Sequence, residues 1–273
     1  MKTKYKIQIA KVISFFLKFL YKKNKIHIKN KIKWCLDLNE GIDLSIFLFG
    51  TSEKKINNLK QLFKSNEKLT IIDIGANVGS ISLPLAKIFN KSKIFAIEPT
   101  NYAFKKLTKN LNLNKDLKKN ISLNQLFLSK KNRPTKVWSS WNFDNSNDKH
   151  KQHLGTLHSI KKKSYISLAN FINLKKINKV DFIKLDVDGH ELDVLKSGEK
   201  FLKDKKPVIF IEIAPYLYPE FGYKCSELIT YIKKLKYSFY SEELKKITDI
   251  DNYIKKITYG GSENFYLMKN YKT

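Results

Sequence analysis

Residues 69–99 read LTIIDIGANVGSISLPLAKIFNKSKIFAIEP and contain two apolar segments separated by a glycine-spaced turn and a helical pattern. The first apolar segment, residues 69–74, is typical of a buried strand. The second, residues 94–97, ends at the carboxylate of Glu98. This order predicts a strand–turn–helix–strand unit, which can bind a nucleoside at the carboxyl ends of its strands.

The turn itself, Gly75-Ala-Asn-Val-Gly79, predicts close approach of the backbone to a ligand, because glycine has no Cβ. Glu98 lies 19 residues after Gly79, where an acid commonly binds ribose hydroxyls. Asn77 stands where a dinucleotide-binding turn has its middle glycine, and Asp73 would repel a pyrophosphate. We therefore expect a phosphate-free, cationic cofactor, S-adenosyl-L-methionine.

A second stretch, residues 180–191 (VDFIKLDVDGHE), carries several titratable groups. A predicted strand places Asp186, Asp188, His190 and Glu191 at or beyond its carboxyl end, which is the ligand-binding edge of an open α/β sheet. His190 is the expected general base, because its ordinary pKa suits neutral pH, and Asp186 is the second candidate. An alternative interpretation assigns Asp188 and Glu191 to a capping box.

Glu212 interrupts the apolar run 207–214, and a charge in such a run needs a partner or a function. A divalent ion held by Asp186 and Glu212 is an alternative way to make an acceptor hydroxyl more acidic. Zinc is not indicated, because the two cysteines are far apart and the histidines in residues 150–158 lack partners at ligand spacing. We therefore assign no metal site.

The formal charge of +28 results from 53 Lys and Arg residues against 25 Asp and Glu residues. Arg133 is the single arginine, and the abundance of Lys, Asn and Ile is typical of A/T-rich codon usage. Proteins that bind phosphates usually use arginine for bidentate contacts. We therefore expect a small-molecule or glycan acceptor and consider nucleic acid a weaker alternative.

The N-terminal segment, residues 4–22 (KYKIQIAKVISFFLKFLYK), predicts an amphipathic helix with a lysine stripe. Its lysines break the apolar run before it is long enough to span a bilayer, and no signal-peptide cleavage site follows. The helix either lies on an anionic membrane or packs on the protein. We expect a cytoplasmic protein, with peripheral contact at the inner face of the membrane as the open alternative.

The rest of the chain alternates predicted strands and helices, which indicates a parallel sheet with helices on both faces. We divide the chain into a basic amphipathic N-terminal helix, a cap and a main domain, at residues 1–29, 30–68 and 69–273. Residues 129–160 are polar and predicted to be irregular, and they include Trp138 and Trp141. These rings would either bind an acceptor or anchor the segment on the core. Further strands are expected at residues 121–127, 180–187, 207–214, 237–240 and 264–268.

The motifs Asp73-Ile-Gly-Ala-Asn-Val-Gly79, Glu98-Pro99 and Lys184-Leu-Asp-Val-Asp-Gly-His-Glu191, in this order, resemble the FkbM family of S-adenosylmethionine-dependent methyltransferases. The resemblance spans roughly residues 30–270. It implies a class I methyltransferase (Rossmann-like) fold, with a seven-stranded, mostly parallel sheet whose last strand is antiparallel. It also implies methyl transfer to oxygen, commonly on a sugar hydroxyl of a glycan or glycolipid, or on a secondary product.

The resemblance also implies roles for single residues. Asp186 and His190 would lie where the acceptor meets the methyl group, and Glu98 would bind the ribose. The cofactor loop would comprise Asp73, Gly75, Asn77 and Gly79.

Three alternative functions remain open. A nucleic-acid methyltransferase that modifies base amines would show an Asn/Asp-Pro-Pro-aromatic tetrad, where this chain has Asp186-Val-Asp-Gly. A nicotinamide-dependent oxidoreductase would need the complete three-glycine turn. A non-catalytic module that binds S-adenosylmethionine and membrane would not need the intact acidic stretch.

Overall fold

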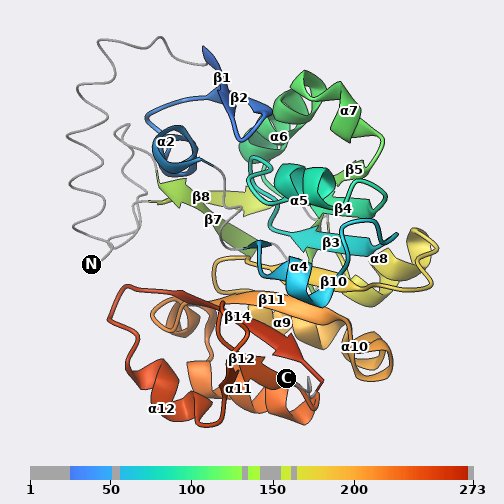
Figure 1. Cartoon of the computed structure of the whole chain (residues 1–273). Coiled ribbons are helices and arrows are strands. Elements are labelled where there is room, and N and C mark those ends of the chain that lie inside the picture. Colours follow the sequence, from blue (N-terminus) through green and yellow to red (C-terminus); the bar gives the residue numbers. More distant parts are fainter. Residues whose placement is uncertain (1–24, 51–55, 131–134, 142–154, 161–164, 270–273) are drawn as a thin grey trace.

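The computed structural model describes residues 25–50, 56–130, 135–141, 155–160 and 165–269. The predicted N-terminal helix, residues 4–22, lies outside the described residues. The centre of the molecule is an eight-stranded sheet with the strand order β13-β12-β14-β11-β10-β3-β4-β5 (Figure 1). Its strands are β3 (Thr70–Ile74), β4 (Lys93–Ile97), β5 (Ile121–Asn124), β10 (Phe182–Leu185), β11 (Val208–Ile213), β12 (Ser238–Tyr240), β13 (Lys246–Ile247) and β14 (Glu263–Met268).

The strand directions confirm the expected class I topology. Strands β5, β4, β3, β10 and β11 pair in parallel. The last strand, β14, is antiparallel to both β11 and β12. The sheet has eight strands and not seven, because Lys246–Ile247 adds a short edge strand, β13, that pairs with β12. Two residues are too few to give a periodic sequence signal.

Alternate residues of the central strands enter two separate hydrophobic cores, one on each face of the sheet. Ile71 of β3 belongs to one core and its neighbour Ile72 to the other. Strands buried on both faces read as continuous apolar runs, which explains their clear sequence signal. The helices around the sheet are α5 (Ser82–Ile88), α6 (Asn101–Leu113), α7 (Lys115–Lys118), α8 (Leu168–Leu174), α9 (Glu191–Ser197), α10 (Glu199–Lys205), α11 (Cys225–Lys234), α12 (Ile250–Lys255) and the 3-10 helix η2 (Tyr218–Phe221).

The residues before β3 form a cap that packs on α6. The cap contains β1 (Lys25–Lys29), β2 (Ile32–Leu36), α2 (Gly41–Phe49) and α4 (Leu59–Leu62). The amide of Cys35 donates to Asn110 Oδ1 at 2.8 Å, and the buried Lys106 pairs with Asp43. Trp34 belongs to the same core as the strand residue Ile71, so the cap shares the core of the main domain.

The expected boundary at residue 30 falls inside a hairpin, because β1 pairs antiparallel with β2. Residues 25–29 are therefore a strand and not part of a helix. None of the helices in the described part of the chain combines the length and apolar composition that a bilayer-spanning helix requires.

The expectation of an irregular segment at residues 129–160 is wrong for part of that segment. Strands β7 (Thr135–Trp141) and β8 (Gly155–Ile160) form an antiparallel hairpin with an irregularity between Trp138 and Trp141. Its many polar residues hide the strand signal, since no continuous apolar run is present. Val137 packs on Phe127 of β6 (Phe127–Leu128), which pairs with β9 (Tyr165–Ile166).

Candidate functional site

Two loops meet at the carboxyl edge of the sheet, one after β3 and one after β10. Gly75 begins the first loop with a φ of +79°. A Cβ at Gly75 would lie 1.8 Å from the carbonyl oxygen of Asp186 in the second loop. Glycine is therefore required here because the two loops pack backbone to backbone, a reason that the sequence alone does not reveal.

Lys184, on β10, connects the same two loops. Its Nζ donates to the carbonyl oxygen of Gly75 at 2.6 Å and lies 3.2 Å from Asp186 Oδ2 and 3.7 Å from Asp73 Oδ1. The side chain is buried. Burial alone would lower the pKa of Lys184, but the carboxylates of Asp186 and Asp73 outweigh it and raise that pKa. The lysine therefore stays charged beneath the site.

Asp73 lies beneath the cofactor loop and is fully buried. Its Oδ2 accepts a hydrogen bond from Ser82 Oγ at 2.5 Å, while Oδ1 faces Lys184. Burial raises the pKa of Asp73, and Lys184 and Ser82 oppose this shift. Asp73 thus joins β3, the start of α5 and Lys184.

Glu98, at the end of β4, accepts three hydrogen bonds. The amide of Asn77 donates to Oε2 at 3.0 Å, and the amide and hydroxyl of Thr100 donate to Oε1 at 2.9 and 2.5 Å. Burial raises the pKa of Glu98, and these donors counteract it. A carboxylate has about four lone-pair sites, so one remains for a ribose hydroxyl.

The second loop glycine, Gly79, serves helix packing. Its φ is +93°, and a Cβ would lie 2.5 Å from Leu83 Cδ1 and 2.8 Å from Leu107 Cδ1. Asn77, between the two glycines, also has a left-handed backbone, with a φ of +47°. The loop therefore keeps a fixed shape that leaves Asn77 half-buried at its tip.

The chemistry of this loop fits S-adenosylmethionine. Glu98 has one lone-pair site that its three donors leave unused. The two carboxylates of Asp73 and Asp186 surround the single positive charge of Lys184, so the net charge favours a further cation nearby. The cation in direct contact with the loop, Lys184, is buried and already engaged by Gly75 and two carboxylates. A pyrophosphate would therefore gain little electrostatic attraction from Lys184.

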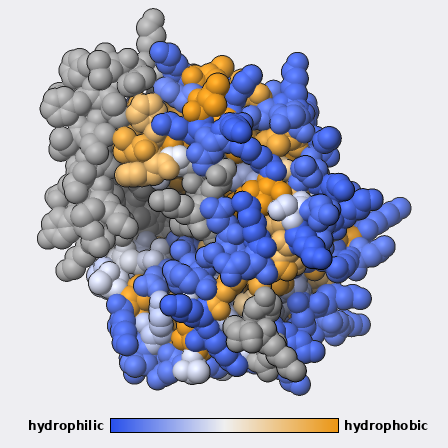
Figure 2. Space-filling model, viewed as in Figure 1, coloured by the Kyte–Doolittle hydropathy of each residue, from blue (hydrophilic) through white to orange (hydrophobic). Residues whose placement is uncertain are grey.

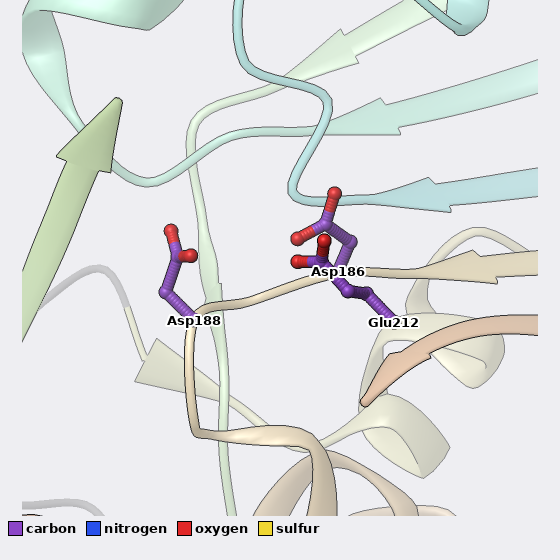
Figure 3. Close-up of side chains that lie close together, drawn as sticks. All are labelled: Asp186, Asp188 and Glu212. Carbon is purple, nitrogen blue, oxygen red and sulfur yellow. The ribbon is translucent and has the colours of Figure 1, made fainter. Parts of the chain in front are cut away.

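Three carboxylates gather beside this loop (Figure 3). Asp186 and Asp188 follow β10, and Glu212 comes from β11. One oxygen from each of the three lies within 4.8 Å of the others, and all three residues are half-buried. We call these residues the carboxylate cluster. Burial, Asp186 and Glu212 together raise the pKa of Asp188 well above its ordinary value.

His190 is separate from the carboxylate cluster, although it is close in sequence. Its buried ring lies edge-on to Phe127 at 5.1 Å between centroids and tilted against Phe221 at 4.3 Å. Phe127 also packs on the β7–β8 hairpin through Val137. His190 therefore lies in an aromatic environment between η2 and β6.

The capping-box interpretation of Asp188 and Glu191 is wrong. Helix α9 begins at Glu191 with His190 at the N-cap, and Asp188 has a left-handed backbone with a φ of +48°. Glu191 Oε1 instead accepts hydrogen bonds from the amides of Val187 at 3.1 Å and Gly189 at 3.3 Å. Asp188 therefore does not cap helix α9.

Comparisons with known proteins match this chain to a family model and to a relative in sequence. The model of the family described as "Methyltransferase FkbM domain" matches residues 73–239, which is more than half of the chain. A tRNA(Phe) (4-demethylwyosine(37)-C(7)) aminocarboxypropyltransferase of Pyrococcus horikoshii is 33% identical over 90 residues, or 33% of this chain. The match spans only 30% of that relative's length.

Solved structures with a similar arrangement include two that share little sequence with this chain. One is M. jannaschii TYW2 in complex with AdoMet, with 20% identity, a TM-score of 0.43, and coverage of 90% of this chain and 85% of that one. Another is precorrin-6y C5,15-methyltransferase from Geobacter metallireducens GS-15, with 12% identity, a TM-score of 0.44, and coverage of 80% and 87%.

Proposed function

Since this chain belongs to the methyltransferase FkbM domain family and its cofactor is S-adenosylmethionine, we propose that it is an O-methyltransferase for a sugar hydroxyl. The acceptor would be a glycan, a glycolipid or a related secondary product. The observation that carries this proposal is the carboxylate cluster beside the cofactor loop. Carboxylates accept hydrogen bonds from hydroxyls, and a sugar presents several hydroxyls close together.

The chain would position the acceptor and remove its proton. When bound, S-adenosylmethionine supplies an electrophilic methyl group, so alignment provides much of the acceleration. As the acceptor oxygen takes this methyl group, a carboxylate of the cluster would accept the hydroxyl proton, and S-adenosylhomocysteine would be the leaving group. Asp188 suits this role by its position, because one of its carboxyl oxygens lies within 4.8 Å of those of Asp186 and Glu212 and its side chain does not cap helix α9.

We propose for Asp186 and His190 the catalytic roles that the sequence predicts. The Asp186 carboxylate is partly exposed and lies next to Lys184, so it can orient the acceptor hydroxyl between the cofactor loop and the cluster. His190 would serve as a base from the aromatic side of the site, between Phe127 and Phe221. We propose all three residues for the acceptor side, and single substitutions distinguish their roles.

A divalent ion is the alternative that the same cluster supports, because three carboxylates within ligand distance suit Mg²⁺. Such an ion would lower the pKa of the acceptor hydroxyl directly. Activity that is lost after chelation and restored by magnesium would assign the cluster to an ion. Activity unchanged by chelation would leave proton transfer to the side chains.

A nucleic-acid acceptor is the second candidate function. The tRNA(Phe) in the name of the P. horikoshii relative and the charge of +28 favour it. A panel of glycans, glycolipids and RNA with labelled S-adenosylmethionine decides between the two. We expect label in a carbohydrate acceptor. Label in RNA would overturn the proposal, and binding of S-adenosylhomocysteine without any transfer would favour a non-catalytic module.

We also propose that residues 4–22 contact an anionic membrane surface, since their sequence combines Phe, Leu and Ile with lysines. Such contact would bring the enzyme to glycolipid acceptors. We expect the chain to bind anionic vesicles and to lose this binding when Phe15 and Phe19 are replaced by serine.

A further inference from the structure

The cap exposes large apolar side chains on two neighbouring elements. Ile26 and Ile28 of β1 are 53% and 66% exposed, and Phe49 at the end of α2 is 80% exposed. Figure 2 shows apolar side chains over β1 and α2 on one face of the molecule. The elements touch through His27 of β1 and Phe47 of α2, whose ring centroids are 5.0 Å apart. Ile26 and Ile28 alternate with His27 and lie on the other side of the strand, and all three apolar side chains flank the β1–β2 turn, where a Cβ at Gly50 would lie 3.0 Å from Asn30 Oδ1. We call Ile26, Ile28 and Phe49, with the lysines of residues 25–33, the β1–α2 face.

The solvent-exposed charged groups around these side chains are all positive. The acids between residues 25 and 50 are Asp37, Glu40 and Asp43, and all three are buried. The basic residues of the same segment are Lys25, Lys29, Lys31 and Lys33, and each reaches solvent. The first 36 residues of the chain contain eleven lysines and no Asp or Glu, so this face continues a wholly basic sequence.

We propose that the β1–α2 face docks on an anionic lipid bilayer. Ile and Phe side chains enter the boundary between headgroups and acyl chains, and neighbouring lysines attract anionic headgroups. Single-stranded nucleic acid fits less well, because its bases need aromatic platforms and two of these three side chains are aliphatic. The inference extends the membrane contact proposed for residues 4–22 to residues that the structure describes.

Co-sedimentation of the full chain with vesicles tests this. The vesicles contain phosphatidylcholine alone or with phosphatidylglycerol. The face variant is Ile28→Ser/Phe49→Ser, and the matched control is Leu174→Ser/Tyr259→Ser, whose original side chains are 66% and 81% exposed on α8 and beyond α12. The face variant should partition into anionic vesicles roughly tenfold or more weakly than the unchanged chain. The control should bind like the unchanged chain.

Each other outcome has a separate meaning. If the face variant binds as well as the control while Phe15→Ser/Phe19→Ser binds poorly, the face proposal is wrong and the contact by residues 4–22 stands. If the unchanged chain does not bind anionic vesicles, both membrane proposals are wrong. The proposal that the chain is a methyltransferase for a sugar hydroxyl does not depend on this result. Self-association that only the face variant loses, without vesicle binding, would assign the face to a second copy of the chain.

Discussion

The ammonium of Lys184 donates a hydrogen bond to the carbonyl oxygen of Gly75 at 2.6 Å and so joins two motifs 109 residues apart. The same ammonium lies 3.2 Å from Asp186 Oδ2. The donor side and the acceptor side of the site are therefore held by one buried cation. This makes Lys184 a positioning residue, a role that the sequence motif containing it does not by itself predict.

Replacing Lys184 with methionine should destabilise the fold and weaken binding of S-adenosylhomocysteine. Removing one partner of a buried ion pair leaves Asp73 as an uncompensated buried charge, which typically costs about 3–5 kcal/mol. Urea denaturation and titration calorimetry measure the two effects. Lys179→Met is the control, because Lys179 pairs with Asp181 at 2.6 Å but is 78% exposed. Equal stability of the two variants would contradict this role.

Gly75→Ala should disrupt the site far more than Gly222→Ala. Both glycines have a φ of +79°, so both substitutions carry the same left-handed strain of roughly 1–2 kcal/mol. Only Gly75 has a backbone atom, the carbonyl oxygen of Asp186, within 1.8 Å of the added Cβ. We expect Gly75→Ala to lose cofactor binding and Gly222→Ala to keep it. Similar thermal unfolding and cofactor affinity in the two variants would refute the close packing of the loops.

Asp186→Asn and His190→Ala test the catalytic roles carried over from the sequence. Loss of a positioned base typically lowers kcat by roughly 10²–10⁴-fold. We expect Asp186→Asn to lower kcat by a similar factor, because the Asp186 carboxylate orients the acceptor hydroxyl for proton transfer. The loss for His190→Ala should be smaller, because the His190 ring is packed between two phenylalanines. Steady-state kinetics with the identified acceptor gives both values. Full turnover by both variants would remove these residues from the mechanism.

Stability should depend on pH through Glu191. Burial raises the pKa of Glu191 to about 7 from an ordinary value of 4.5. Between these two values the folded chain binds a proton that the unfolded chain has lost, so the free energy of unfolding falls as pH rises. Glu191→Gln retains an acceptor for the amides of Val187 and Gly189, and it should flatten this slope and raise the Tm at pH 8 relative to the unchanged chain.

Thermal unfolding at pH 5 and pH 8 measures this difference. Glu40, whose pKa burial also raises to about 7, adds a slope of the same sign, so Glu191→Gln reduces the slope without abolishing it. An unaltered slope in Glu191→Gln would show that Glu191 titrates normally in the folded chain.

The sheet was predictable because its strands are buried on both faces. Runs such as residues 69–74 and 207–214 are apolar throughout, and the glycine turn and Glu98 marked the cofactor side. The fold, the family and the cofactor inferred from these motifs are confirmed. The hairpin β7–β8 and the two-residue β13 were missed, because neither contains a long apolar run.

The site was only partly predictable because its contacts are tertiary. The spacing of Asp188 and Glu191 matches a capping box. The left-handed backbone of Asp188 shows that this residue does not cap the helix, and this backbone conformation is not evident from the sequence. Lys184 had a usable signal, since a lysine inside the apolar strand β10 needs a buried partner for the same reason as Glu212. Which carboxylates it would meet could not be read from the sequence.

The most direct test of the proposed site compares methyl transfer with cofactor affinity in Asp188→Asn. Asp188 belongs to the carboxylate cluster and lies outside the Gly75 loop, so the two functions should separate. We predict that transfer of labelled methyl to the acceptor falls by roughly 100-fold or more, while affinity for S-adenosylhomocysteine stays within a few fold. Unchanged transfer by Asp188→Asn, or an equal loss of transfer and affinity, would contradict the assignment of the cluster to the acceptor.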